Sequence, residues 1–300
     1  MNGKPRILMC RPDHFGVTYS INPWMDPTGW ASEAQTLAAA AKDEWRALHR
    51  ILKSLGATIH LVPPEAGLPD LVFTANAAVV MDRVALLAHF RYPERQGEEA
   101  HFERAFRKLE AARLIDEVRH LPPGVCLEGA GDCVWDKTRG LFWMGYGPRS
   151  DKAAQDAVED CFGIETVALE LADPRFYHMD TALCPLSSGD LLYVPCAFTA
   201  AGLAEIHSRV EPSRRIAIDA ADAVRLASNA ISIGDDIVLS HCGEDLRRRL
   251  AALGYRVHET PLGSFALSGG SAFCLTLRLD NRSERARRGA AHPAPALAFG

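Results

Sequence analysis

Apolar and polar residues follow two different periods along this chain. Apolar residues three and four positions apart predict helices, and short runs rich in β-branched and aliphatic residues predict strands. Three of the four helical patterns stop next to a glycine, which is a common helix terminator. Helices are predicted at 33–55, 98–115, 151–162 and 243–253, and strands directly after three of them at 57–62, 164–169 and 255–260.

A degenerate repeat organises these elements. Five segments place a polar residue among small ones and continue into β-rich runs, and they recur every 45 to 56 residues. A period near 50 indicates a propeller or a repeat array. One unit reads strand, strand, helix, strand, so we expect a five-bladed ββαβ α/β propeller with pseudo-fivefold symmetry. The five segments are Phe73-Thr-Ala-Asn76, Glu128-Gly-Ala-Gly-Asp132, His178-Met-Asp180, Ala227-Ser-Asn229 and Gly269-Gly-Ser-Ala-Phe-Cys274.

The length of the chain leaves the number of domains open. Its 300 residues permit two domains, but one large α/β domain fits equally well. The repeat favours a single catalytic domain over residues 1–280. Residues 281–300 are Arg-rich and then Ala/Pro-rich, so we expect a flexible C-terminal tail there.

Composition excludes several classes of protein. The chain is 48% apolar, its formal net charge is −5 and its pI is near 6.1. This mildly acidic balance argues against nucleic acid as the main partner, and no apolar run is long enough to span a membrane. The first ten residues lack the apolar core of a signal peptide, so the cytosol is the expected compartment. A homo-oligomer is compatible with the sequence.

The eight cysteines do not form a metal or redox motif. They lie far apart without CxxC pairs, and in a reducing compartment most are expected to be small buried hydrophobic residues. His178-x-Asp180 has no further histidine at a companion ligand spacing, so we expect neither a metal nor another cofactor.

The repeat brings chemically capable residues to one place. A cysteine, a histidine and several carboxylates from different repeats could form a set of nucleophile, base and orienting group. Taken alone, Gly-Ala-Gly-Asp is usually a turn and a cysteine in an apolar strand is usually part of the core. Their equivalent positions in five repeats favour the functional interpretation. The residues expected to converge are Asn76, Glu128, Asp132, His178, Asp180, Asn229 and Cys274.

The same segments, in the same order, resemble those of the guanidino-group-modifying enzymes. This superfamily includes arginine deiminases, dimethylarginine dimethylaminohydrolases, amidinotransferases and arginine dihydrolases. The resemblance covers roughly residues 5 to 280 and implies the five-bladed α/β propeller. It also implies that an arginine-like small molecule is the substrate.

The resemblance assigns roles to the central residues. A guanidinium carbon is a poor electrophile, so the group must be held fixed while a thiolate attacks it. Cys274 is then the nucleophile of a covalent thiouronium-type intermediate, and His178 is the acid and base. Glu128 orients and charge-stabilises His178, while Asp180 holds the guanidinium nitrogens. Asp132 and Asn229 are expected to line the substrate site.

Two arginines match the family's carboxylate-binding positions. Arg95 and Arg149 could bind the substrate's α-carboxylate through bidentate forks, with Arg91 as a rival to Arg95 and a solvated surface position as the alternative for each. The stretch Tyr19-Ser-Ile-Asn22-Pro resembles a segment of arginine dihydrolases in which an asparagine contacts the substrate. An Asn-Pro turn is the simpler interpretation of Asn22.

One departure from the family bears on the number of hydrolytic steps. Deiminases and dimethylarginine hydrolases carry an acidic residue where this chain has Asn76. A neutral amide can hydrogen-bond both a guanidinium and a neutral ureido group, so citrulline could stay bound and react again. The expected activity is an arginine dihydrolase that forms ornithine, two ammonia and carbon dioxide. A single-step deiminase or dimethylarginine hydrolase, and a catalytically silent arginine- or partner-binding propeller, remain alternatives.

Overall fold

The computed structural model describes residues 4–284, which form five small sheets of three strands each. In every sheet the middle strand pairs antiparallel with one neighbour and parallel with the other. This repetition confirms the predicted α/β class. The sheets are β15–β1–β2 (Leu277–Arg278, Arg6–Cys10, Thr58–Val62), β3–β4–β5 (Ala78–Met81, Val84–Leu87, Glu117–Arg119), β6–β7–β8 (Cys133–Asp136, Leu141–Tyr146, Thr166–Glu170), β9–β10–β11 (Leu183–Pro185, Leu191–Tyr193, Arg215–Ala217) and β12–β13–β14 (Ile231–Ile233, Asp236–Leu239, Arg256–Glu259).

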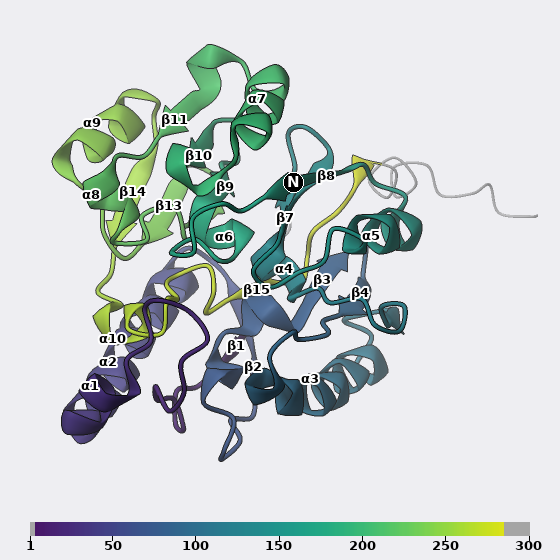
Figure 1. Cartoon of the computed structure of the whole chain (residues 1–300), viewed down its shortest axis with the longest axis vertical. Coiled ribbons are helices and arrows are strands. Elements are labelled where there is room, and N and C mark those ends of the chain that lie inside the picture. Colours follow the sequence, from purple (N-terminus) through teal and green to yellow (C-terminus); the bar gives the residue numbers. More distant parts are fainter. Residues whose placement is uncertain (1–3, 285–300) are drawn as a thin grey trace, which may run out of the picture.

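A helix joins the two parallel strands of each sheet, as parallel pairing requires a crossover connection. These outer helices lie around the edge of the molecule, whereas the short helices α4 and α6 lie near its middle (Figure 1). Four units therefore have the predicted order of strand, strand, helix and strand along the chain, whereas in the fifth the antiparallel strand β15 comes after all the other strands. The outer helices are α2 (Ala34–Ser54, preceded by α1, Pro27–Ser32), α3 (Pro93–Ala111), α5 (Ala154–Phe162), α7 (Ala200–Arg209) and α9 (Glu244–Ala252).

The two ends of the chain share one sheet. Leu277 of β15 lies opposite Leu8 of β1, and β1 also pairs with β2. Contacts continue past the predicted domain boundary at 280, because the Ser283 N–H donates to Asp82 Oδ1 at 2.8 Å and the Asp82 N–H donates to the Asn281 carbonyl. Residues 281–284 thus belong to the folded unit, and the rest of the predicted tail lies outside the described residues.

Short helical turns carry the polar residues inward. The 3-10 helix η2 (Thr74–Ala77), α4 (Gly129–Asp132) and α6 (Met179–Ala182) each stand directly before the first strand of a sheet, and α4 packs against both of the others. Another short turn, α8 (Ala220–Ala223), precedes β12, and α10 (Gly263–Ala266) precedes β15. The first three repeat motifs therefore lie at η2, α4 and α6, whereas the last two lie between α8 and β12 and between α10 and β15.

Among the outer helices, α3 and α7 differ most from the sequence prediction. α3 begins at Pro93, five residues before the predicted start, because proline suits the first helical position and its fixed φ favours the helix. α7 is absent from the prediction; its first turn is capped by the Thr199 side chain, which accepts a hydrogen bond from the Gly202 N–H. Apolar periodicity contains neither the proline at the first position of α3 nor the side-chain cap of α7.

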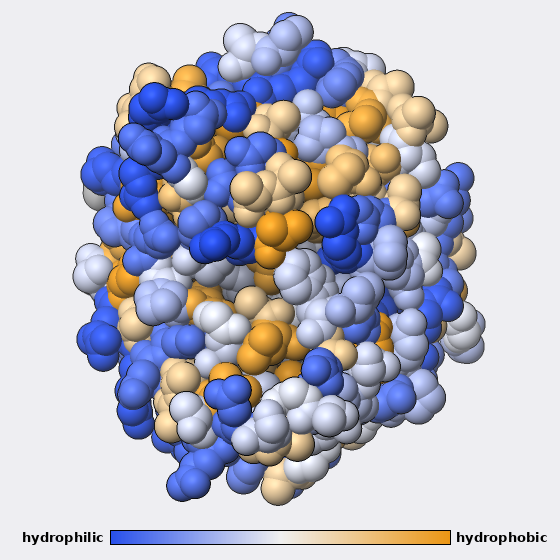
Figure 2. Space-filling view, turned by 60° about the vertical axis from the view of Figure 1, so that its left-hand side comes forward, coloured by the Kyte–Doolittle hydropathy of each residue, from blue (hydrophilic) through white to orange (hydrophobic). Residues whose placement is uncertain are grey.

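The surface in Figure 2 is mostly hydrophilic, with scattered apolar side chains. Large apolar residues that are well exposed come from separate elements, as Leu61, Val224 and Leu253 illustrate. Within residues 4–284, no helix combines the length and the apolar character needed to cross a bilayer.

Candidate active site

Cys274 lies in a polar cradle made by two other repeats. Its thiol donates to Asp180 Oδ2 at 3.1 Å, and Asn229 Nδ2 donates to the sulfur at 3.1 Å. The Cys274 N–H donates to Asn229 Oδ1, so one amide side chain holds both the backbone and the sulfur of the cysteine. Asn229 therefore positions Cys274, which is only 2% exposed.

His178 and Glu128 form the second half of the predicted set. His178 Nε2 lies 2.8 Å from Glu128 Oε2, and both side chains are buried. Burial lowers the pKa of His178 to about 4, although Glu128 acts in the opposite direction. Burial alone would raise the pKa of Glu128, but Arg149 and His178 hold it well below its usual range. The pair thus joins a neutral imidazole to an ionised carboxylate at neutral pH.

Burial also controls the protonation of the nucleophile. It raises the pKa of the Cys274 thiol well above its usual value, and the Asp180 carboxylate adds to this effect. Burial raises the pKa of Asp180 to about 7, against the hydrogen bonds that it accepts from Cys274 and Asn229. A thiol beside a buried carboxylate needs a nearby cation to become a thiolate.

Two charged side chains near this set each have one buried polar atom without a hydrogen-bond partner in the described part of the chain. These atoms are Asp180 Oδ1 and Arg149 Nε. Arg149 otherwise donates to Glu128 Oε2 at 2.9 Å and to the Ile21 carbonyl, and its guanidinium lies over the rings of Tyr92 and Tyr177. Unpaired buried groups are costly, so each marks a place where a ligand group of opposite charge would be stabilised.

Asn76 and Arg95 are in direct contact. Arg95 Nη1 donates to Asn76 Oδ1 at 2.9 Å, and Asn76 Nδ2 donates to the Glu128 carbonyl at 3.3 Å. Glu98 binds the other edge of the Arg95 guanidinium through two hydrogen bonds of 2.8 Å. Burial raises the pKa of Glu98 to about 7 even though Arg95 lowers it. Arg95 is thus held by the protein, and its predicted role towards the α-carboxylate stays a prediction.

Two other residues from the sequence analysis make contacts with the protein. Both oxygens of Asp132 are engaged, one by the Ser150 hydroxyl and the other by the Met179 N–H, so its contacts favour a positioning role over the predicted substrate contact. Asn22 accepts from the Trp24 N–H in a local turn and donates to the Ser268 carbonyl. Its substrate contact stays a prediction.

The rival arginine, Arg91, lies beside the site, and its N–H donates to Glu128 Oε1 at 3.4 Å. The Arg91 side chain donates to the Arg149 carbonyl and pairs with Asp151, and about a third of it is exposed. Arg95 is instead buried against Asn76. The contacts therefore favour Arg95 over Arg91 as the arginine of the site.

Several residues at the site escaped the sequence analysis. Glu98 lay at the predicted start of its helix, which left Arg95 outside that helix. Because the helix begins at Pro93, Arg95 and Glu98 lie in the same helix, three positions apart. Asp70 accepts from the Tyr19 hydroxyl at 2.8 Å and from Ser268, and lies 3.9 Å from Arg95. Asp70 lies far in sequence from Ser268, and neither Asp70 nor Glu98 belongs to a repeat motif.

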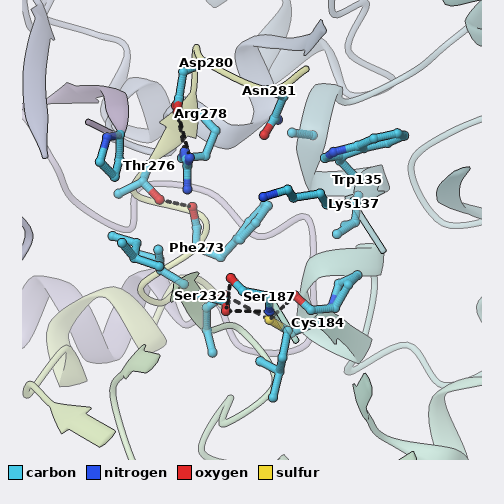
Figure 3. A pocket seen from close by; sticks show the side chains of 18 of the residues that line it. Trp135, Lys137, Cys184, Ser187, Ser232, Phe273, Thr276, Arg278, Asp280 and Asn281 are labelled. Atoms are coloured by element: carbon cyan, nitrogen blue, oxygen red, sulfur yellow. Dashed lines mark hydrogen bonds and ion pairs between the residues drawn. The ribbon is translucent and has the colours of Figure 1, made fainter. Parts of the chain in front are cut away.

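A cavity of about 870 Å³ lies away from these groups. It is lined by hairpin turns and by residues between 276 and 282, including Lys137, Ser187 and Arg278, and none of the predicted catalytic or binding residues lines it (Figure 3). Its lining includes chain neighbours of the candidate residues, namely Ala130, Cys133, Ala230 and Phe273. This cavity is distinct from the candidate active site.

Comparisons with known proteins agree with this geometry. A family model described as N,N dimethylarginine dimethylhydrolase, eukaryotic, matches residues 11–194. The N(G),N(G)-dimethylarginine dimethylaminohydrolase of Mycobacterium tuberculosis is 36% identical over 276 residues, which is 91% of this chain and 85% of that protein. The chain belongs to the dimethylarginine dimethylaminohydrolase family.

Arginine dihydrolases are also similar to this member of the family. The bifunctional arginine dihydrolase/ornithine cyclodeaminase ArgZ of Synechocystis is 42% identical over 274 residues, or 91% of this chain. The chain spans only 37% of the length of that protein. The solved N-terminal domain of ArgZ, a cysteine-to-serine mutant bound to substrate, has 39% identity and a TM-score of 0.86, covering 93% of this chain and 99% of that domain.

Proposed function

We propose that this protein is a cysteine-dependent arginine dihydrolase built on a five-bladed ββαβ propeller with pseudo-fivefold symmetry. The observation that carries the activity is the set of Cys274, Asp180 and Asn229 beside the His178–Glu128 pair. The unpartnered Asp180 Oδ1 suits a guanidinium, and the unpartnered Arg149 Nε suits a carboxylate. Arginine carries both groups, and similar proteins named arginine dihydrolases support this substrate.

Binding of arginine would activate the nucleophile. A guanidinium beside Asp180 supplies the cation that lowers the pKa of the Cys274 thiol, which burial otherwise keeps high. The thiolate forms a C–S bond to the guanidinium carbon, and ammonia leaves with a proton delivered through His178. Water then attacks the same carbon, His178 takes a proton from it, and the C–S bond breaks to give citrulline and the thiol.

A second round completes the reaction. Cys274 attacks the ureido carbon of citrulline, a second ammonia leaves, and water releases a carbamate that decarboxylates to ornithine. Two waters are consumed in all, and ornithine, two ammonia and one carbon dioxide are formed. Asn76 supports this second round because an amide, unlike a carboxylate, can donate a hydrogen bond to the ureido oxygen.

Hydrolysis of methylated arginine is the second candidate function. The family model and the 36%-identical relative named dimethylarginine dimethylaminohydrolase favour it. The same nucleophile would then release dimethylamine and leave citrulline. The cytosolic location and a homo-oligomeric state stay predictions from the sequence.

Product analysis by mass spectrometry tests the proposal. With arginine, the wild type should release about two ammonia per ornithine and little citrulline, and added citrulline should also yield ornithine. Cys274→Ser should abolish turnover and still bind arginine, because a hydroxyl is far less ionised than a thiol at neutral pH. Stoichiometric citrulline without ornithine would exclude the dihydrolase. Dimethylamine released from dimethylarginine faster than ammonia from arginine would favour the second candidate.

A further inference from the structure

The orientation of the Asn76 amide is fixed by two partners of opposite character. Arg95 can only donate hydrogen bonds, and it contacts Asn76 Oδ1 at 2.9 Å. The Glu128 carbonyl can only accept, and it contacts Asn76 Nδ2 at 3.3 Å. A flipped amide would place NH₂ against a guanidinium and oxygen against a carbonyl oxygen, so both contacts would become repulsive.

Glu98 holds the arginine that imposes this orientation. Its carboxylate binds Arg95 Nε and Nη2 at 2.8 Å each, which fixes the plane of the guanidinium and directs Nη1 at Asn76. Both Glu98 and Arg95 are almost completely buried. A bidentate pair of this kind has little freedom to rotate.

Gly131 leaves the space into which the amide projects. A Cβ atom at this glycine would lie 2.1 Å from Asn76 Nδ2 and 3.5 Å from His178 Nδ1. The amide nitrogen thus takes the room left by the missing side chain, near His178 Nδ1, which makes no hydrogen bond to any residue in the range 4–284. Asn76 Nδ2 has two hydrogens and uses one on Glu128, so the second remains for a ligand beside His178.

We propose that Glu98 is a positioning residue for the second hydrolytic step. Glu98 holds Arg95, and Arg95 holds the Asn76 amide so that an Asn76 N–H is available beside His178. There the Asn76 N–H can donate a hydrogen bond to the ureido oxygen of citrulline. A guanidinium has no acceptor for this N–H, because all its polar groups are donors. This inference rests on the proposed function. It predicts that loosening Glu98 weakens the handling of citrulline more than that of arginine.

Binding and product measurements test this role. In the Cys274→Ser background, calorimetry with added Glu98→Gln should show citrulline affinity reduced about tenfold and arginine affinity changed by about twofold or less. With Cys274 intact, the same change should lower the ratio of ornithine to citrulline. Glu103→Gln, which removes a charge from the exposed side of the same helix, is the matched control and should change neither.

The alternative outcomes are distinct. An equal loss of affinity for both ligands, with an unchanged ratio of ornithine to citrulline, would overturn the inference. It would show that Glu98 affects only the binding of the α-carboxylate that both ligands share. If thermal melting shows that Glu98→Gln does not fold, Arg95→Lys replaces it, since lysine keeps the charge but cannot be braced at two points. Failure of the Cys274→Ser protein with Glu98 intact to bind either ligand would instead refute the proposed function, and this inference with it.

Discussion

At the residue scale, the candidate site depends on polar groups held away from water. Cys274, His178 and Asp180 are all buried, and burial shifts the pKa of each away from its value in solvent. It raises the pKa of Cys274 and Asp180 and lowers that of His178. Burial keeps the thiol protonated and the imidazole neutral until a ligand arrives. The site is thus set to respond to a cation, which is the charge that arginine brings.

The pH dependence of ligand binding follows from Asp180. Its pKa is raised to about 7 by burial, so below pH 7 it must lose a proton before it can pair with a guanidinium. The affinity of Cys274→Ser for arginine should therefore fall about tenfold for each pH unit below 7, whereas that for neutral citrulline should change little. His178, whose pKa is lowered to about 4, stays neutral over this range.

Calorimetry between pH 5 and 8 measures this difference. The same linkage acts on folding: a native pKa above the unfolded value adds stability at low pH, and this contribution disappears between about pH 4 and pH 7. If the affinities for arginine and citrulline changed with pH in the same way, the titrating group would be one that binds the α-amino or α-carboxylate group that both ligands share. This result would contradict the role given to Asp180.

The sequence predicted which residues come together in the structure better than it predicted the contacts between them. Cys274, His178, Glu128 and Asp180 could be predicted because each lies in a repeated motif. The pairing of Arg95 with Asn76 could not, because it depends on side-chain directions that a motif does not encode. Asp132 is the reverse case, since its motif is plain but its oxygens bind Ser150 and Met179.

At the element scale, the turns before the first strands do the positioning. The segment that leads to Cys274 passes through Gly269, whose φ of +81° lies in the left-handed region. A Cβ there would lie 2.7 Å from the Tyr177 hydroxyl and 2.8 Å from Trp24 Cδ1. The backbone needs a glycine at this point for both its conformation and its close approach to Tyr177.

Gly269→Ala should therefore lower both thermal stability and turnover. The variant combines left-handed strain, about 1 kcal/mol, with displacement of Tyr177 next to His178. Gly234→Ala is the control, because Gly234 also has a positive φ but its Cβ would meet nothing within 4 Å. Similar losses of melting temperature and kcat in the two variants would argue that only the backbone strain matters.

Helix boundaries show where periodicity stops being informative. The repeating unit and the outer helices α2, α3, α5 and α9 were predictable, because an amphipathic helix buries its apolar face. The start of α3 was not, since the polar first turn at Pro93 carries no periodic signal. That turn contains Arg95, so a five-residue error at a helix end concealed the Glu98–Arg95 pair.

At the scale of the whole molecule, the two ends of the chain meet in one sheet. β15 supplies the strand that β1 and β2 lack, and it is only two residues long. Leu277 of β15 is buried in a core cluster that also contains Leu8 of β1 and Phe102 and Phe106 of α3. This cluster joins the sheet at the chain ends to the helix that carries Arg95 and Glu98.

Leu277→Ala should accordingly destabilise more than its own short strand. Loss of a buried leucine costs about 3 kcal/mol when the surroundings cannot close the cavity, and here the cavity would lie between two sheets. Urea unfolding should show this loss, and hydrogen exchange should show reduced protection in β1 and β2 together with β15. Leu253→Ala, at an exposed position 46% accessible at the end of α9, is the control and should change the free energy of unfolding by about 0.5 kcal/mol or less. An equal effect of both substitutions would mean that β15 is a peripheral strand, and that β1 and β2 hold the N-terminal part of the fold without it.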